Sequence, residues 1–184
     1  MTPVAPGIYT IDRFLAAEEC RTRISAAEAV SFDAATVNTR KGAISSPDIR
    51  NNSRLLLDDR ALAEALWLRL RSAIPGFMSG RQPVGLNERF RFYRYGPSEK
   101  FSGHTDAPYQ RENGEKSLLT FMVYLNDDFS GGETAFQNVV IKPETGLALL
   151  FRHELFHEGK PVIAGRKYVL RSDVMFGPPG TVAG

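Results

Sequence analysis

The second half of the chain alternates short strand-like segments with turn residues, and this pattern limits the possible folds more than any other feature. The segment Arg89–Tyr95 places Arg and Tyr side chains on one face and mainly Phe on the other, as a half-buried strand does. Closely spaced short strands are typical of a sandwich or a barrel. The strands are expected at residues 89–95, 118–125, 133–137, 139–141, 147–151 and 167–176.

The first third of the chain predicts a smaller amount of mixed structure. A short strand is expected at Gly7–Phe14, and residues 16–30, rich in Ala and Glu and free of Gly and Pro, favour a helix. Asp58 and Asp59 stand where the N-cap of a second helix belongs, and that helix should end near Pro75. The chain as a whole is therefore expected to be mainly β with flanking helices.

Length and composition narrow the class of protein. The 184 residues suit one domain, 1–184, with an N-terminal supporting part at 1–80 and a core at 85–177. The 23 Lys and Arg nearly balance the 21 Asp and Glu, which argues against a nucleic-acid partner. Cys20 is the only cysteine, so a disulfide framework and a Cys-rich zinc site are excluded. Without a membrane-length apolar run or a signal-like start, we expect a cytoplasmic protein with no membrane partner.

Histidine placement carries the first functional signal. The chain has three histidines, and the first lies in the sequence His104-Thr105-Asp106. If this segment is extended, His104 and Asp106 project to one face. Together with a distant second imidazole they can form the two-His, one-carboxylate facial triad of non-haem Fe(II) oxygenases. A surface His beside a solvated Asp would produce the same short sequence.

A longer run around this motif resembles a known family. The residues from Tyr95 to Asp106, YGPSEKFSGHTD, resemble the Y-G-x-G-x-x-F-x-x-H-x-D signature of prolyl 4-hydroxylase-like 2-oxoglutarate oxygenases. Ser98 stands where that family commonly has Gly. Further similar segments follow in the expected order: LTF and YLN within 119–126, GGETAF at 131–136, GLALLF at 146–151, HEGKPV at 157–162 and GRKY at 165–168.

The resemblance implies a fold, a metal and an activity. The fold would be a double-stranded β-helix, a jelly-roll with a cupin-like core. His104, Asp106 and His157 would be the metal ligands and hence the catalytic residues. The cofactors would be Fe(II), the co-substrate 2-oxoglutarate and O₂, with ascorbate as a candidate reductant.

The resemblance also points to residues that bind 2-oxoglutarate. The family's basic residue, which pairs with the distal carboxylate, falls on Lys167, and a dicarboxylate needs a cation opposite its metal-bound end. Arg171 lies on the same strand face and competes for this role. Tyr95 and Tyr124 match positions that surround the co-substrate, and Met122 shares the face of Tyr124. The sequence does not decide between Lys167 and Arg171.

A rival motif overlaps the second histidine of the proposed triad. The sequence from His153 to His157 reads H-E-x-x-H, which is the signature of zinc proteases when it lies on a helix. Gly159 and Pro161 follow at once and oppose a helix. We therefore expect a turn at 152–154, with His153 a partly exposed bystander or a residue of the pocket rim.

The predicted function is an Fe(II)- and 2-oxoglutarate-dependent oxygenase. It would hydroxylate a C–H bond of its substrate and release succinate and CO₂. The expected substrate is prolyl or amino-acid-like, either within a peptide or free, or is another small molecule. The alternative is a non-catalytic cupin-like module that binds a metal or ligand. The polar loop 38–52 and the segment Ala107–Lys116 are candidate lids, and Arg89 and Arg91 are candidate pocket residues. No oligomeric state is predicted.

Overall fold

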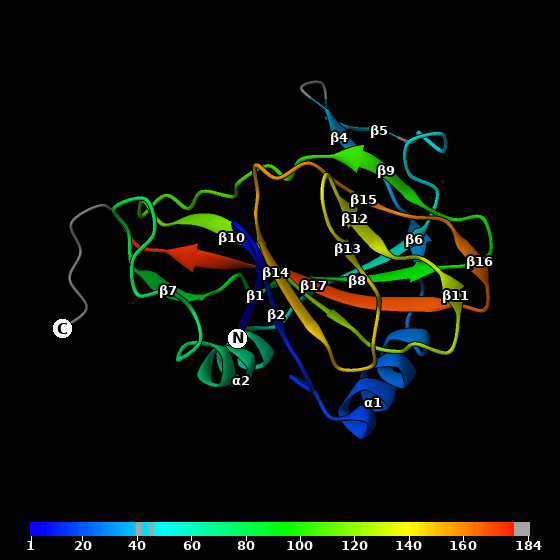
Figure 1. Cartoon of the computed structure of the whole chain (residues 1–184), viewed down its shortest axis with the longest axis horizontal. Helices are drawn as coiled ribbons and strands as arrows, with labels where there is room; N and C mark the ends of the chain where they lie inside the picture. Colours follow the sequence, from blue (N-terminus) through cyan, green and yellow to red (C-terminus); the bar gives the residue numbers. More distant parts are fainter. Residues whose placement is uncertain (40–41, 45, 179–184) are drawn as a thin grey trace.

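A computed structural model describes residues 1–39, 42–44 and 46–178, and two facing β-sheets dominate it (Figure 1). The strands of the larger sheet pair antiparallel throughout. In spatial order they are β1 (Thr2–Ala5), β2 (Ile8–Ile11), β14 (Ala148–Arg152), β10 (Lys116–Tyr124), β17 (Lys167–Phe176), β8 (Arg89–Tyr95), β6 (Ser53–Asp58) and β3 (Asp33–Ala34), and β7 (Pro83–Leu86) also pairs with β17.

The smaller sheet lies over the central part of the larger one. Its strands are β13 (Val140–Ile141), β12 (Thr134–Phe136), β15 (His157–Gly159) and β9 (Phe101–His104). Two separate strand pairs complete the β-structure: β11 (Ser130–Gly131) with β16 (Val162–Ala164), and β4 (Val37–Thr39) with β5 (Gly42–Ile44). This arrangement confirms the predicted double-stranded β-helix.

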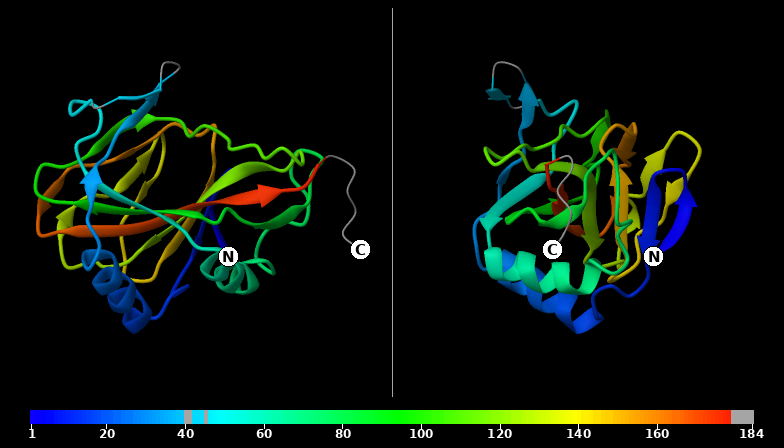
Figure 2. Two further views of the ribbon diagram at one scale, coloured as in Figure 1. Left: turned by 180° about the vertical axis from the view of Figure 1, so that it is seen from behind. Right: turned by 90° about the vertical axis from the view of Figure 1, so that its left-hand side faces the viewer.

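Both helices cover the outer face of the larger sheet, at the lower edge of the molecule in Figure 1 and again in Figure 2. Helix α1 (Ala17–Glu28) and helix α2 (Arg60–Leu70) fall within the two predicted helical segments. Asp59 caps α2, because its carboxylate accepts the Leu62 N–H at 2.9 Å. The side chains that α2 buries against the sheet are Ala63, Leu66 and Leu70.

Strand β8 separates two hydrophobic clusters. Phe90 and Phe92 pack into the cluster beneath the helices, whereas Tyr93 and Tyr95 pack into the cluster between the two sheets. This is the alternation that the sequence predicts for residues 89–95. The side of β8 that carries the tyrosines therefore faces the interior of the jelly-roll.

Strand register places the other interior residues on this same face. On β17, Lys167 is the register partner of Tyr95 on β8, and Arg171 is the partner of Arg91. Arg171 is also the partner of Met122 on β10. Since paired residues point to the same side of a sheet, one continuous face of three strands lines the interior.

One glycine is required by a close approach between the N-terminal segment and the sheet. Gly146, just before β14, has a φ of 82°, and a Cβ atom there would lie 2.0 Å from the Leu15 carbonyl oxygen. The Leu15 N–H donates to the Gly146 carbonyl at 3.2 Å. Glycine thus lets the chain that leads into α1 lie against the major sheet.

The segment 38–52 differs from the loop expected there. It contains the β4–β5 hairpin, which projects at the end of the molecule opposite the helices (Figures 1 and 2). Residues 40, 41 and 45 lie outside the described residues. The following strand, β6, was not predicted either, because SRLLLD has no alternation and directly precedes the helix cap. Among the described residues, no helix is long and apolar enough to cross a membrane.

Candidate metal centre and co-substrate pocket

Three side chains with metal-binding atoms meet between the two sheets. His104 ends β9, Asp106 follows it by two residues, and His157 begins β15. His104 and His157 are direct register partners on these neighbouring antiparallel strands. One ligand atom from each of the three side chains lies within 4.8 Å of the other two. The backbone pairing of β9 with β15 thus joins residues that are far apart in the sequence.

Hydrogen bonds orient both imidazole rings. The Nδ1 atom of His104 lies 2.8 Å from the Ser102 carbonyl oxygen, and Nδ1 of His157 lies 2.9 Å from the Leu155 carbonyl oxygen. A carbonyl can only accept, so each Nδ1 carries the proton and each Nε2 has a free lone pair. These two Nε2 atoms lie 3.8 and 3.9 Å from the Asp106 carboxylate oxygens.

The charge states of the cluster suit a metal ion. Burial, followed by the neighbouring His157, lowers the pKa of His104 to about 4. Burial alone would raise the pKa of Asp106, but Arg171 and the two histidines outweigh it, and the pKa lies well below its ordinary value. At neutral pH the site therefore presents neutral imidazoles and an ionised carboxylate, the forms that bind metals.

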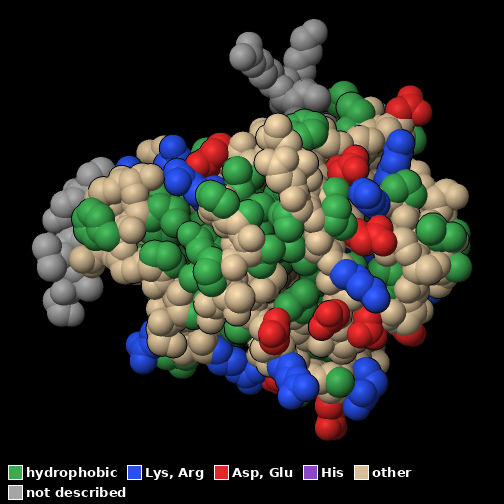
Figure 3. Space-filling view, viewed as in Figure 1, with side chains coloured by type: hydrophobic (Ala, Val, Ile, Leu, Met, Phe, Trp, Pro, Cys, Tyr) green, Lys and Arg blue, Asp and Glu red, His purple; other side chains and the backbone are tan. Residues whose placement is uncertain are grey.

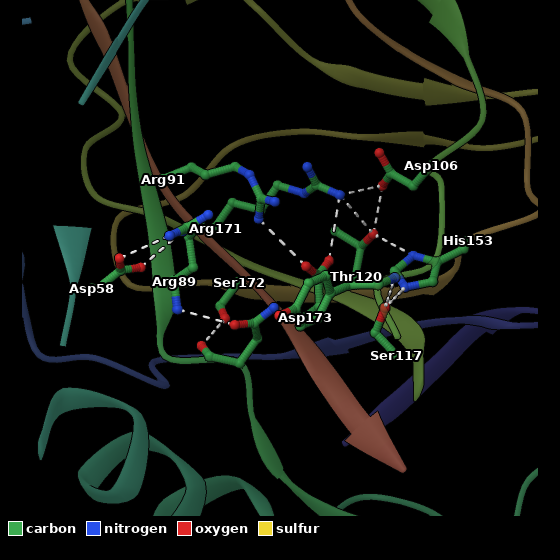
Figure 4. A network of polar contacts seen from close by, with 12 residues as sticks. Asp58, Arg89, Arg91, Asp106, Ser117, Thr120, His153, Arg171, Ser172 and Asp173 are labelled. Carbon is green, nitrogen blue, oxygen red and sulfur yellow. Dashed lines mark hydrogen bonds and ion pairs between the residues drawn. The ribbon is translucent and has the colours of Figure 1, made fainter. Parts of the chain in front are cut away.

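A polar network behind Asp106 holds its carboxylate (Figure 4). The Thr120 hydroxyl donates to Asp106 Oδ2, and Arg171 Nη2 lies 2.9 Å from the same oxygen. Because the Thr120 proton goes to Asp106, His153 must donate from Nδ1 to the Thr120 oxygen, 3.0 Å away. The other ring nitrogen, Nε2, accepts from the Ser117 hydroxyl at 2.9 Å.

This network corrects the expectation for His153. His153 is only 4% exposed, so it is neither a partly exposed bystander nor a residue of a solvent-facing pocket rim. The expected turn is present, since residues 153–154 form a turn and His157 lies in a strand. The H-E-x-x-H sequence is not helical, which removes the geometry that a zinc protease needs. In Figure 3 no histidine side chain is visible on the face shown.

The side chains of His104, Asp106 and His157, called the metal cluster below, line a cavity of about 440 Å³, a volume that includes its open mouth. Lys167 lines the same cavity. Lys167 is 3% exposed, and its Nζ atom donates to the Gly132 carbonyl oxygen at 2.6 Å. Nζ also lies 5.1 and 5.4 Å from the ring centres of Tyr95 and Tyr124. No carboxylate lies within ion-pair distance of Lys167 among the residues that the structure describes.

Burial lowers the pKa of Lys167 to about 7. A buried ammonium without an anionic partner is costly, so this position calls for an acidic ligand. The two histidines and one carboxylate likewise match the donor set of non-haem Fe(II) centres. Both observations fit a divalent iron and a dicarboxylate that is held at its far end by Lys167.

The remaining predicted co-substrate residues lie near Lys167 in different ways. Tyr95 and Met122 line the cavity. Tyr124 is fully buried, and its hydroxyl donates to Thr134 Oγ1 at 2.7 Å, so only its ring is turned toward Lys167. Thr134 itself lines the cavity, although sequence reasoning did not identify it.

Arg171 does not share the position of Lys167. It contacts Asp106, its Nη2 lies 3.4 Å from Asp173 Oδ1, and its Nη1 donates to the Tyr93 hydroxyl at 3.3 Å (Figure 4). The two cations are therefore placed at different parts of the cavity. Arg89 is also separate, because it is exposed and pairs with Asp58 on the surface. Of the two candidate strand arginines, only Arg91 lines a hollow at the site.

Comparison with known sequences agrees with this geometry. A family profile of the 2OG-Fe(II) oxygenase superfamily matches residues 90–172. A putative prolyl 4-hydroxylase of Acanthamoeba polyphaga mimivirus is 31% identical over 107 residues, which are 47% of this chain and 44% of the viral protein. Prolyl 4-hydroxylase 1 of Arabidopsis thaliana is 24% identical over 191 residues, covering 89% of this chain and 67% of the plant protein. The chain thus spans less than half of the viral relative.

Solved structures share the fold. The viral collagen prolyl hydroxylase of Paramecium bursaria Chlorella virus-1, in complex with 2OG, has a TM-score of 0.63 at 23% identity, covering 94% of this chain and 99% of its own. A Trichoplax adhaerens prolyl hydroxylase, in complex with a hypoxia inducible factor peptide fragment, has a TM-score of 0.67 at 18% identity, covering 91% and 83%. The chain is thus similar in sequence to the 2OG-Fe(II) oxygenase superfamily over residues 90–172 and to prolyl 4-hydroxylases, and it shares the fold of solved prolyl hydroxylases.

Proposed function

We propose that the protein is an Fe(II)- and 2-oxoglutarate-dependent hydroxylase. One observation carries the proposal: a two-His, one-carboxylate cluster shares a cavity with a buried lysine that lacks a carboxylate partner among the described residues. His104, Asp106 and His157 would hold Fe(II) on one face and leave positions open for ligands. When bound, Fe(II) and 2-oxoglutarate supply the oxidising chemistry that inserts one atom of O₂ into a C–H bond, releasing succinate and CO₂.

The protein's own contribution is to bind, orient and exclude water. Lys167 would pair with the distal carboxylate of 2-oxoglutarate, a charge-assisted hydrogen bond that replaces its bond to the Gly132 carbonyl. Thr120 and Arg171 keep Asp106 ionised and in one orientation. The cavity walls also include the apolar side chains Phe151 and Val169, which limit the access of water to the reacting groups.

We propose a class of substrate for this protein and not a single compound. Two structural neighbours are described as a collagen prolyl hydroxylase and as a prolyl hydroxylase in complex with a peptide fragment. These descriptions support a prolyl, peptidyl or amino-acid-like substrate, with another small molecule as the wider class. Because a fold hosts many reactions, the residues at the mouth of the cavity must decide among them.

A ligand-binding experiment tests the proposal against a cupin-like module that only binds a metal or ligand. We expect anaerobic protein with Fe(II) and 2-oxoglutarate to develop the weak visible charge-transfer band of their chelate, and aerobic protein to release succinate. The variant His157→Ala should show neither. Metal binding without that band in the wild-type protein would favour the binding module instead.

A further inference from the structure

A second hollow opens beside the metal cluster, on the side of His104 and Phe101, and arginine side chains crowd it. Its lining includes four arginines and two aspartates. One of these aspartates, Asp106, belongs to the metal cluster, and the other, Asp173, lies between two of the arginines. The basic residues are Arg50, Arg54, Arg91 and Arg171. Cationic groups therefore outnumber anionic groups in this outer hollow.

Arg50 is buried but not fully hydrogen bonded. Arg50 is 5% exposed, and its guanidinium carbon lies 4.4 Å from the ring centre of Tyr93 and 4.3 Å from that of Phe101. Nε donates to the Asn52 side-chain oxygen at 2.8 Å. The Nη2 atom is buried and has no hydrogen-bond partner of acceptable geometry among the described residues. Because a buried cationic N–H without a hydrogen-bond partner is costly, this atom is suited to a ligand that supplies an acceptor.

Arg91 and Arg171 are held in an unfavourable pairing. They are direct register partners on β8 and β17, and like charges opposite one another destabilise a sheet. Asp173 is shared between them, with both contacts at 3.4 Å (Figure 4). Arg171 also pairs with Asp106 and donates to the Tyr93 hydroxyl, whereas Arg91 makes only this 3.4 Å contact among the described residues, which does not saturate its five donors. The surplus donors remain available to a further anion.

Arg54 adds a fourth cation on the same side. It is the register partner of Tyr93, and its Nη2 donates to the Thr36 hydroxyl at 3.1 Å. Burial lowers the pKa of Arg54, and the nearby Arg50 and Arg91 lower it further. Burial would raise the pKa of Tyr93, yet the surrounding arginines bring it to about 8. The lowered pKa of Tyr93 reports a positive potential in the hollow, and Arg50 and Arg91 act in the same sense on Arg54.

We propose that the outer hollow binds a carboxylate or phosphate group of the substrate, held by Arg50, Arg54 and Arg91. The inference rests on the proposed hydroxylase function and names its substrate class. Planar guanidinium groups match both oxyanions in geometry and charge. Tyr93, Phe101 and His104 line both the metal cavity and the outer hollow, so an anion bound there would place the rest of the substrate beside the metal cluster.

This substrate class differs from an internal prolyl residue of a neutral peptide. Such a residue offers backbone carbonyl acceptors but no negative charge, so binding it here would exclude water from three arginines and leave their positive charge uncompensated. A free amino acid or another small oxyacid supplies the anion. The site is also distinct from the co-substrate anchor, since Lys167 does not line the outer hollow.

Calorimetric titration of the protein with small probes tests the inference without turnover. The protein is loaded with Fe(II) and saturating 2-oxoglutarate in the absence of O₂ and at low ionic strength, so that screening is small. Methyl phosphate and acetate are the anionic probes, and acetamide is the neutral one. The test variants are Arg54→Gln and Arg91→Gln. The matched control is Arg89→Gln, which lies two residues from Arg91 on the same strand but pairs with exposed Asp58.

We expect at least one anion to bind and acetamide not to bind. Each test variant should weaken anion binding about 10-fold or more, the effect of losing a charged hydrogen bond, whereas Arg89→Gln should not change it. The tighter anion distinguishes a phosphate ester from a carboxylic acid. Melting temperatures of all variants confirm that each is folded.

Three results would overturn the inference: no anion binding to the wild-type protein with or without 2-oxoglutarate, equal binding by all three variants, or binding seen only in parallel samples that lack 2-oxoglutarate. The last result would assign the anion to the Lys167 site. The charge-transfer band recorded on the same samples tests the proposed function separately. If the band is absent, the titration is repeated on the metal-free protein, where the same three results decide.

Discussion

Replacing Lys167 by Met tests whether this lysine anchors the co-substrate. The substitution keeps an unbranched side chain of similar length but removes the only cation at that part of the described cavity. Arg171 cannot take its place, because four residues along a strand span about 13 Å. Losing one charged hydrogen bond costs about 1.5–3 kcal/mol, so the 2-oxoglutarate requirement should rise roughly 10- to 150-fold.

The fold should tolerate this substitution. Burial lowers the pKa of Lys167 to about 7 in the folded protein, below its ordinary value of 10.5. The charged form therefore destabilises the folded state, fully below about pH 7 and progressively less as the pH rises toward 10.5. Met carries no such penalty, so the melting temperature of Lys167→Met near neutral pH should equal or exceed that of the wild-type protein.

Titration of 2-oxoglutarate into anaerobic Fe(II) protein, followed by the chelate absorbance, measures the effect. The exposed neighbour Arg166 provides the control variant Arg166→Met, which should bind like wild type. Above about pH 7, wild-type affinity should fall toward tenfold per pH unit as Lys167 loses its proton, whereas Lys167→Met should show no such dependence. A loss of affinity confined to Arg171→Met would show that the anchor is Arg171 instead.

Three further predictions concern the metal cluster and the turn before it. His157→Ala should abolish metal binding in an equilibrium titration, whereas His153→Ala should retain it, since the His153 side chain reaches Asp106 only through Thr120 and its carbonyl bond to the Asp106 N–H is kept in Ala; equal losses would contradict this division. Thr120→Val should weaken metal binding about 10- to 100-fold by removing the donor that orients Asp106, with Thr120→Ser restoring most of it. Ser98→Gly should raise stability by about 1 kcal/mol in denaturant unfolding, because Ser98 has a φ of 66°; an unchanged midpoint would refute this strain.

Local patterns explain why much of the fold and the metal cluster could be predicted. Alternation along residues 89–95 assigns Tyr93 and Tyr95 to the interior, and the H-x-D spacing places His104 and Asp106 together. The pairing of His157 with His104 is not local and entered only through the family resemblance. The sequence could not separate Lys167 from Arg171, because strand periodicity gives both residues the same face.

Long-range contacts explain what could not be predicted. His153 is buried by hydrogen bonds to Thr120 and Ser117, which are 33 and 36 residues away, and nothing near the turn indicates them. Arg50 and Arg54 lie in or beside a polar segment whose residues resemble an ordinary loop. They come together in the outer hollow because β6, which carries Arg54, pairs with β8, and because Arg50 forms a bridge with Phe101.

The β9–β15 ladder has a consequence for how the protein gains and loses its metal. Backbone pairing fixes the separation of His104 and His157, and carbonyl bonds fix their rings, so the donor atoms are arranged before any ion arrives. Small zinc domains, by contrast, fold only when the ion binds. Here the polypeptide should remain intact through repeated loss and reloading of iron. Occupancy, and with it turnover, can then follow the cellular supply of ferrous ion without consuming the protein.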